Sequence, residues 1–213
     1  MRHVAVIDYG MGNLRSVSKA LETVSEHATI HITADPEQIL NADHIVFPGV
    51  GAMRDCASEL KRLGLDDVIR EATQTKPFLG ICLGMQALLS HSEENNGITA
   101  LDIVPGQVRH FDTERARSDH DFKVPHMGWN EVKQRLSHPL WQNISDASRF
   151  YFVHSYYVDP AEASVIAGTS QYQHEFTAAL CQENVFAVQF HPEKSQSAGL
   201  QLLKNFLNWD GQS

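Results

Sequence analysis

The sequence has few cysteines, and none is placed as a disulfide framework would require. Cys56, Cys82 and Cys181 are the three cysteines of the 213 residues, they lie far apart, and no Cys-x-x-Cys pair occurs. An odd number of widely spaced cysteines predicts no disulfide framework and is typical of a reducing compartment. We therefore expect a cytoplasmic protein.

Long apolar runs and positive charge are also lacking. No run of 18 apolar residues occurs, so we expect no membrane-spanning helix. The chain begins directly with a strand-like run at residues 1–8, without the apolar region and cleavage site of a signal peptide. The formal net charge of −9 argues against nucleic acid as the main partner.

Motifs for metals and dinucleotides are absent as well. The twelve histidines include no His-Glu-x-x-His and no Cys/His pairing of recognised spacing, so we expect no metal site. The Gly10-x-Gly12 turn lacks the third glycine of a dinucleotide fingerprint, because position 15 is Arg15. No acidic residue closes a second strand at the expected place, and we expect no cofactor.

What is present suits a globular enzyme. Hydrophobic residues make up 42% of the chain and charged residues 20%, which allows a sizeable core and excludes a disordered chain. Strand and helix patterns alternate along the first half, and this order predicts an α/β fold with a parallel sheet. The expected strands are residues 4–7, 28–33, 45–47 and 78–81, and the expected helices are residues 14–24, a short helix from Asp35-Pro36, 53–63, 66–71 and 85–89.

The second half changes to short β-like runs separated by turns. We therefore expect a single domain over residues 1–213, with an open, mostly parallel sheet flanked by helices and added antiparallel strands. The expected runs are residues 100–104, 107–111, 149–153, 164–168, 177–181 and 185–190, with a polar loop at 91–97, an exposed loop at 113–121, a hairpin turn at Glu183-Asn184 and a final helix at 198–207.

One strand-to-helix junction carries the pattern of a nucleophile elbow. The apolar run 78–81 leads into Gly80-x-Cys82-x-Gly84, and a helical pattern follows at once. At such an elbow the nucleophile adopts a strained backbone, and the flanking glycines let strand and helix approach. The helix dipole then favours a thiolate at Cys82. The alternative is that Cys82 is a small buried hydrophobic residue, as most free cysteines are.

A second motif supplies the base, and the carboxylate that orients the base, which a cysteine nucleophile needs. His191-Pro192-Glu193 follows the last apolar run. His191 and Glu193 are two residues apart, so in an extended segment both side chains point to the same side. A carboxylate there can fix the imidazole tautomer and stabilise the imidazolium. The two motifs together predict nucleophilic catalysis by cysteine.

Together, the two motifs resemble class I, or triad-type, glutamine amidotransferases, and the resemblance covers essentially the whole chain. It implies a flavodoxin-like core, with Cys82 as nucleophile, His191 as base and acid, and Glu193 as the residue that orients His191. The run from Pro48 to Gly51 matches the family's oxyanion strand. The resemblance therefore implies an oxyanion hole formed by Gly49, Val50 and Leu83, with the N–H groups of Val50 and Leu83 as donors.

Four stretches resemble one branch of this family, the glutaminase subunits of imidazole glycerol phosphate synthases. They are residues 8–14, 48–51, 80–86 and 125–130, and the run Pro-His-Met-Gly-Trp-Asn is the most discriminating. The resemblance implies hydrolysis of glutamine through a thioester on Cys82, in histidine biosynthesis. Ammonia would pass to a separate (β/α)8-barrel cyclase subunit in a heterodimer, which makes imidazole glycerol phosphate and aminoimidazole carboxamide ribotide.

The resemblance also implies contact residues. Implied glutamine contacts are Gly51, Gln86, Glu94, Ser155 and Tyr156, and implied partner contacts are Asn13, Met127, Trp129, Tyr151 and Lys194. The peptide of Val50, between two glycines, can rotate cheaply, so we expect slow hydrolysis by the chain alone.

Three other functions are compatible with the same motifs. The chain could serve another synthase, of the pyridoxal phosphate, anthranilate or purine pathway. It could be a catalytically silent binding module on the same scaffold, although an intact Cys82, His191 and Glu193 argues against this. It could also be a peptidase or γ-glutamyl hydrolase that acts without a partner.

Overall fold

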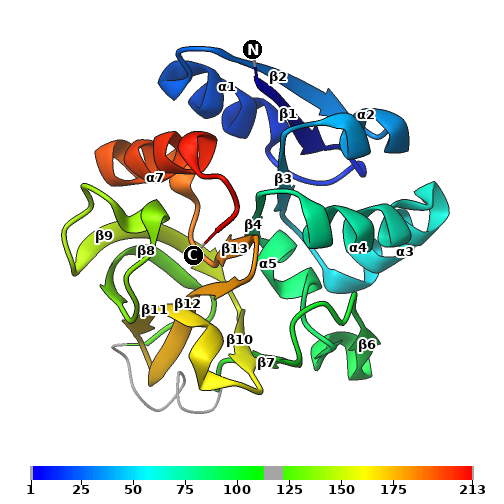
Figure 1. Ribbon diagram of the computed structural model, residues 1–213. Helices are drawn as coiled ribbons and strands as arrows, with labels where there is room; N and C mark the ends of the chain where they lie inside the picture. Colours follow the sequence, from blue (N-terminus) through cyan, green and yellow to red (C-terminus); the bar gives the residue numbers. More distant parts are fainter. Residues whose placement is uncertain (1, 113–121, 213) are drawn as a thin grey trace.

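A five-stranded parallel sheet forms the centre of the computed structural model, which describes residues 2–112 and 122–212 (Figure 1). Its strand order is β2-β1-β3-β4-β13, and every neighbouring pair is parallel. This is the order of flavodoxin-like sheets, in which ligands bind at the carboxyl ends of the strands. The strands are β1 (Arg2–Ile7), β2 (Ala28–Thr33), β3 (His44–Gly49), β4 (Phe78–Cys82) and β13 (Val185–Val188).

Helices cover both faces of this parallel sheet (Figure 1). Successive residues of β1 alternate between the faces: Val4 and Val6 pack into the hydrophobic cluster beneath α1 and α7, and Ala5 and Ile7 pack into the cluster beneath α2, α3 and α4. Buried apolar layers therefore fix the strands from both sides. The helices are α1 (Leu14–Val24), α2 (Pro36–Asn41), α3 (Met53–Leu63), α4 (Leu65–Thr75), α5 (Leu83–Ala87) and α7 (Gln196–Asn208).

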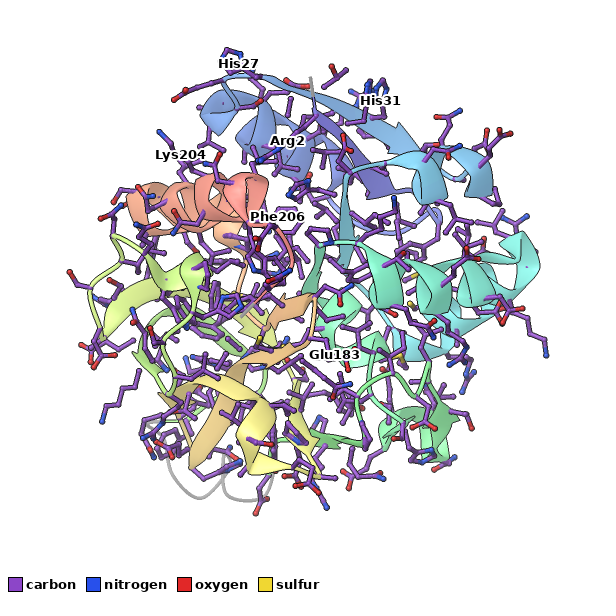
Figure 2. The ribbon with its side chains drawn as sticks, viewed as in Figure 1. Arg2, His27, His31, Glu183, Lys204 and Phe206 are labelled. Carbon is purple, nitrogen blue, oxygen red and sulfur yellow. The ribbon has the colours of Figure 1, made fainter. Side chains whose placement is uncertain are left out.

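The last helix shows how one face is buried and the other solvated. Phe206 of α7 is fully buried, edge-on to the ring of His44, whereas Lys204 is exposed and its Nζ lies 3.4 Å from a carboxylate oxygen of Glu26 (Figure 2). The guanidinium of Arg2 donates to the carbonyl of Leu207 at the end of this helix. The contacts with Arg2 and His44 attach α7 to the amino ends of strands β1 and β3.

Added strands extend the sheet beyond β13, and all of their pairings are antiparallel except the parallel pair β5–β7. Strand β12 pairs with β13 and leads on to β10, β7, β5 and β6, while β11 joins β12 to the β8–β9 ribbon. The added strands are β5 (His91–Ser92), β6 (Ile98–Thr99), β7 (Gly106–His110), β8 (His126–Gln134), β9 (Ser148–His154), β10 (Tyr156–Pro160), β11 (Ile166–Gln171) and β12 (Glu175–Gln182). Short 3₁₀ turns lie between them at η1 (Glu94–Asn96), η2 (Pro139–Trp141), η3 (Ala163–Val165) and η4 (Pro192–Lys194).

The predicted α/β fold, with a parallel sheet, flanking helices and added antiparallel strands, is confirmed. The hairpin turn at Glu183-Asn184 is present, with Gln182 opposite Val185. The strand predicted at residues 100–104 is wrong, because this segment is a loop. Its backbone N–H groups donate to carbonyls at the end of α5, as in the bonds from Leu101 to Ala87 and from Ile103 to Leu88, both 2.9 Å.

Several other predicted boundaries also differ. The helix after the elbow begins two residues earlier than predicted, at Leu83. The run predicted at 164–168 begins as the 3₁₀ turn η3, and the last strand ends at Val188 rather than 190. Strands β5, β6, β8 and β10 were not predicted, and β5 and η1 lie within the predicted polar loop at 91–97. The expected loop at 113–121 lies outside the described residues. In the described part of the chain, no helix is both long and apolar enough to cross a membrane.

Candidate active site

Cys82 has a backbone conformation that ordinary residues avoid. It is the last residue of β4 and the N-cap of α5, with φ 54° and ψ −108°. A positive φ is strained for a residue with a side chain, and such strain persists only where the surroundings impose it. The predicted elbow is therefore present at the carboxyl end of the central strand.

The two glycines of the elbow allow close contacts that no side chain would permit. A Cβ on Gly84 would lie 1.9 Å from the carbonyl oxygen of Phe47, and one on Gly80 would lie 3.0 Å from the Cβ of Ala187. Gly84 thus lets α5 rest directly on β3, and Gly80 lets β4 pack closely against β13. These contacts hold Cys82 in its strained position.

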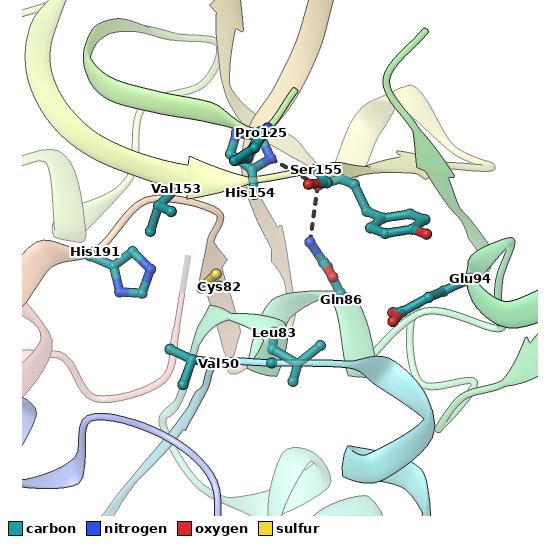
Figure 3. A pocket seen from close by; sticks show the side chains of 12 residues that line it. Val50, Cys82, Leu83, Gln86, Glu94, Pro125, Val153, His154, Ser155 and His191 are labelled. Carbon is teal, nitrogen blue, oxygen red and sulfur yellow. Dashed lines mark hydrogen bonds between the residues drawn. The ribbon is translucent and has the colours of Figure 1, made fainter. Parts of the chain in front are cut away.

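His191 lies beside Cys82 because β13 is the neighbour of β4. It follows β13 by three residues, and its backbone N–H donates to the carbonyl of Tyr151 at 2.9 Å. Figure 3 shows the imidazole and the thiol facing each other across the cavity. Nε2 of His191 is buried and has no nitrogen or oxygen hydrogen-bond partner among the described residues, so it is available to exchange a proton with the thiol or the substrate.

Glu193 is the charged partner of His191. Its Oε1 lies 2.9 Å from Nδ1 of His191, and the two side chains are 1% and 2% exposed. Burial would lower the pKa of His191, but hydrogen bonds with Cys82 and Glu193 outweigh it and raise this pKa to about 10. The site therefore favours the protonated form of His191, next to the sulfur of Cys82, and a protonated histidine favours the reactive form of a neighbouring cysteine.

A buried glutamine that was not predicted also touches the nucleophile. Gln189 is fully buried, and its Nε2 donates to Sγ of Cys82 at 3.7 Å. Its Oε1 accepts from Nε2 of Gln86 at 3.1 Å. Gln189 precedes His191 by two residues, and this spacing was the one sequence signal that could have identified it.

A cavity of about 330 Å³ opens over the thiol. It brings together almost all of the residues predicted to form the catalytic and glutamine-binding site. The predicted residues that line it are Val50, Gly51, Cys82, Leu83, Gln86, Glu94, Ser155, Tyr156 and His191. Pro125, Val153 and His154 line it too and were not predicted to do so.

The oxyanion segment and Glu94 form the cavity wall opposite His191. Gly49 ends β3 directly opposite Cys82, Val50 is 39% exposed, and Gly51 has φ +105°. Glu94 is held by its Oε2, which accepts a 2.8 Å hydrogen bond from the N–H of Met53, the first residue of α3. A carboxylate is thus fixed near one end of the cavity, where it can attract a cation.

The residues predicted to contact a partner lie on one side of the cavity. Met127 and Trp129 on β8 are 61% and 38% exposed, and Trp129 packs edge-on to Tyr151, which is opposite it on β9. Nζ of Lys194 lies 6.0 Å from the centre of the Tyr151 ring. Asn13, at the start of α1, is exposed, and α1 contacts the η4 turn that carries Lys194.

Comparison with known proteins agrees with this geometry. A sequence model of the family described as glutamine amidotransferase class-I matches residues 5–209, so the chain belongs to this family. The chain is 58% identical to imidazole glycerol phosphate synthase subunit HisH of Nitrosococcus oceani over 213 residues, with 100% of both chains covered. It is 56% identical to the protein of the same name from Pseudomonas putida over 211 residues, with 99% of each covered. The resemblance seen in the sequence is thereby confirmed.

Solved structures show the same fold at low sequence identity. PurLQS from Thermotoga maritima matches with a TM-score of 0.72 and 17% identity, over 98% of this chain and 99% of that one. The glutaminase domain of Trypanosoma brucei CTPS, with bound acivicin, matches with a TM-score of 0.63 and 17% identity, over 100% and 98%. At these identities the likeness concerns the fold alone.

Proposed function

We propose that this chain is the glutaminase subunit of an imidazole glycerol phosphate synthase. It hydrolyses glutamine to glutamate and ammonia, and the ammonia is used by a (β/α)8-barrel cyclase subunit in histidine biosynthesis. The observation that carries the proposal is that Cys82 and His191 line one cavity and that Glu193 is paired with His191 behind it. The full-length similarity to proteins named imidazole glycerol phosphate synthase subunit HisH supports the choice of pathway.

The first half of the reaction forms a thioester. The proton of the Cys82 thiol is held on Nε2 of His191, and Sγ of Cys82 attacks the side-chain carboxamide carbon of glutamine as a thiolate. The N–H groups of Val50 and Leu83 stabilise the oxyanion of the tetrahedral intermediate. When the C–N bond breaks, His191 returns the proton to the leaving nitrogen, and ammonia departs.

The second half releases glutamate. Nε2 of His191 takes a proton from water, and the hydroxide attacks the thioester carbon. The C–S bond then breaks, Cys82 leaves as a thiolate beside the protonated His191, and glutamate departs. Throughout, Glu193 keeps the proton on Nδ1 of His191 and stabilises the imidazolium, so one tautomer serves both halves.

The cavity wall suits the amino-acid end of glutamine. The carboxylate of Glu94 and the side-chain carbonyl of Gln86 can bind its ammonium group. Gly51, Ser155 and Tyr156 line the same cavity and add backbone and side-chain groups. These five residues place the carboxamide of glutamine over Cys82.

The partner docks on the exposed residues of β8 and their neighbours. Met127 and Trp129 form an apolar patch, and such residues are enriched at interface hot spots. Val153, which is opposite Met127, lines the cavity itself, so the patch continues into the active site. The contact set on the cyclase side of this chain is Asn13, Met127, Trp129, Tyr151 and Lys194.

Replacement of the nucleophile tests the proposal directly. In the complex with the cyclase, Cys82→Ala abolishes glutamine-dependent synthesis and leaves ammonia-dependent synthesis intact, because the cyclase needs only ammonia. Cys56→Ser and Cys181→Ser are the controls and retain glutaminase activity. Loss of both activities in a correctly assembled Cys82→Ala complex would refute the two-site reaction.

A genetic test separates this pathway from the related ones. Deletion of the gene produces a requirement for histidine, and the chain co-purifies with a barrel protein. A requirement for pyridoxal phosphate, tryptophan or purines instead would identify another synthase as the partner enzyme.

A further inference from the structure

Two buried histidines next to the cavity form a hydrogen-bonded pair that the reaction described above does not use. His126 and His154 are directly opposite each other on β8 and β9, and they are 4% and 6% exposed. Nδ1 of His126 lies 2.9 Å from Nε2 of His154. Aromatic rings surround the pair, including those of Phe111, Phe152, Phe176 and Tyr172.

The hydrogen-bond partners at each end of the pair determine which nitrogen of each imidazole ring carries the proton. Nδ1 of His154 is 2.8 Å from the carbonyl of Tyr156, which can only accept, so Nδ1 carries a proton. Nε2 of His154 then accepts from the Nδ1–H of His126. Nε2 of His126 in turn accepts from Nδ2 of Asn130 at 3.3 Å, and the same Nδ2 donates to the carbonyl of Gln171.

Both rings are neutral at neutral pH, as this order of donors requires. Burial lowers the pKa of His126 to about 4. Burial also lowers the pKa of His154 to about 3, with a further decrease from the nearby His126 and His191. Each ring therefore has one donor and one acceptor, and the chain of hydrogen bonds runs in a single direction.

The chain ends in the glutamine site. The carbonyl of Tyr156 accepts a second hydrogen bond, from Nε2 of Gln86 at 3.0 Å; this bond and the one from His154 are drawn as dashed lines in Figure 3. The other N–H of Gln86 donates to Gln189, which donates to Sγ of Cys82. Both N–H groups of the Gln86 amide are thereby used, and its Oε1 remains as an acceptor for the cavity.

We propose that His126 and His154 are positioning residues for glutamine hydrolysis, which hold the Tyr156 carbonyl and thereby the amides of Gln86 and Gln189 in one orientation. If the Gln86 amide rotated by half a turn, its oxygen would face the oxygen of Tyr156. A fixed carbonyl at Tyr156 therefore selects the rotamer that presents Oε1 to substrate. The inference rests on the proposed glutaminase function.

The burial of two polar rings in an aromatic pocket supports a role beyond packing. A buried polar group must find its hydrogen bonds or lose stability, and leucine or phenylalanine would fill an apolar pocket without that requirement. Here each ring nitrogen is paired, and the pairing leads to the substrate site rather than to solvent. His138 offers a contrast, since its Nε2 is buried without a partner among the described residues.

The tautomers of His126 and His154 in the wild-type protein give the first test. With ¹⁵N-labelled histidine, long-range ¹⁵N–¹H spectra should show both His126 and His154 protonated on Nδ1 at neutral pH, whereas the Nε2–H form is the usual one in solution. Assignment uses single His→Asn variants. An Nε2–H tautomer in either ring would overturn the proposal, and this result does not depend on any activity.

Kinetics of the complex with the cyclase give the second test. His154→Leu should raise KM for glutamine about tenfold with a smaller change in kcat, because one oriented hydrogen bond is lost. His154→Asn is smaller but keeps an N–H donor near the position of Nδ1, so its KM should return to within about threefold of wild type.

A control variant separates positioning from packing. His138→Leu removes a histidine buried to the same extent, 5% exposed, but outside this chain of hydrogen bonds, so it should lower thermal stability and leave KM unchanged. An unchanged KM in folded His154→Leu, or equal KM values for the Leu and Asn variants, would refute the proposal. A wild-type complex that releases no glutamate would instead reject the proposed function, and the tautomer test would still decide the positioning.

Discussion

Three cysteines with similar burial differ because of what surrounds the sulfur. Cys56, Cys82 and Cys181 are 0%, 6% and 7% exposed, so accessibility does not separate Cys82 from Cys181. Burial raises the pKa of Cys56 to about 12 and that of Cys181 to about 11, and both remain thiols. Cys82 alone faces a histidine that is held in its charged form.

We therefore predict that alkylation at neutral pH is selective for Cys82, because the thiolate is the reactive form. Iodoacetamide followed by peptide mass spectrometry should modify Cys82 at least roughly tenfold faster than Cys181. Denatured protein, in which all three cysteines react, is the control. Equal rates for Cys82 and Cys181 in the folded chain would show that His191 does not activate the nucleophile.

Glu193→Gln should reduce glutaminase turnover by roughly 10²–10⁴, less than Cys82→Ala does. The amide keeps the shape of the side chain but removes the charge that raises the pKa of His191, so the pH profile should also move to lower pH. Glutamate release measured from acid to alkaline pH tests both effects. Wild-type turnover in this variant would mean that another residue orients His191.

The residues of the site were predictable to different degrees for physical reasons. Cys82, His191 and Glu193 lie in short motifs in which glycine or proline stands at a fixed position, so these residues can be recognised in the sequence. Gln189 and His154 act through side chains at the ends of strands β13 and β9, where no glycine marks them. Their roles depend on strand pairing, which brings together residues far apart in the chain.

At the scale of elements, the elbow depends on the contact of α5 with β3. Gly84→Ala should lower the free energy of unfolding by about 3 kcal/mol or more, since the new Cβ would overlap the carbonyl of Phe47. Urea unfolding measures the loss. Gly64→Ala is the matched control: its φ is 65° but no atom lies within 4 Å of the new Cβ, so it should cost only about 1 kcal/mol. Gly84 has no positive φ, so similar losses in both variants would mean that its contact with Phe47 costs no more than the backbone strain at Gly64.

The strands of the parallel sheet could be predicted from the sequence. Of the β8–β9 ribbon, only β9 could be predicted. Strands buried on both faces appear as continuous apolar runs, and α1 and α3 have clear apolar stripes. Strand β8 instead alternates buried His126 with exposed Met127 and Trp129, which reverses the usual pattern of apolar inside and polar outside. The same reversal makes β8 a candidate for partner contact.

At the scale of the whole molecule, buried histidines set the response to pH. The pKa values of His126 and His138 fall to about 4 and that of His154 to about 3, each because of burial. An unfolded histidine has a pKa near 6.5, so below this pH the unfolded chain binds more protons than the folded one. Their stabilising contribution is complete above about pH 6.5 and is lost as the pH falls toward about 4.

His191 acts in the opposite sense. Its folded pKa is about 10, so its contribution is complete below about pH 6.5 and is lost as the pH rises toward 10. Together the four histidines favour maximal stability near pH 6.5. Urea midpoints at about pH 4.5, 6.5 and 9 test this, and His138→Leu should make the acid side less steep. A constant midpoint between about pH 4.5 and 6.5 would contradict the prediction.

Regulation by the partner is a second property of the whole complex. If the Val50 N–H points away from the oxyanion until the partner and its ligand bind, kcat should rise by roughly 10²–10³ on their addition, far more than KM falls. Glutamate release is measured for the chain alone, with the cyclase, and with cyclase plus its nucleotide-like ligand. Equal kcat values in these three measurements would mean that the oxyanion hole is permanently formed and that the partner does not regulate it.

The position of β13 determines how much of the chain must be made before the candidate active site can assemble. The strand follows β12 in the chain, yet it fills the place between β4 and β12 and brings His191 to Cys82. Before β13 inserts, the chain carries its thiol without the base and has two unpaired strand edges. Under the proposed function, a chain that stops before β13 consumes no glutamine, and the insertion of one central strand completes the sheet and the triad together.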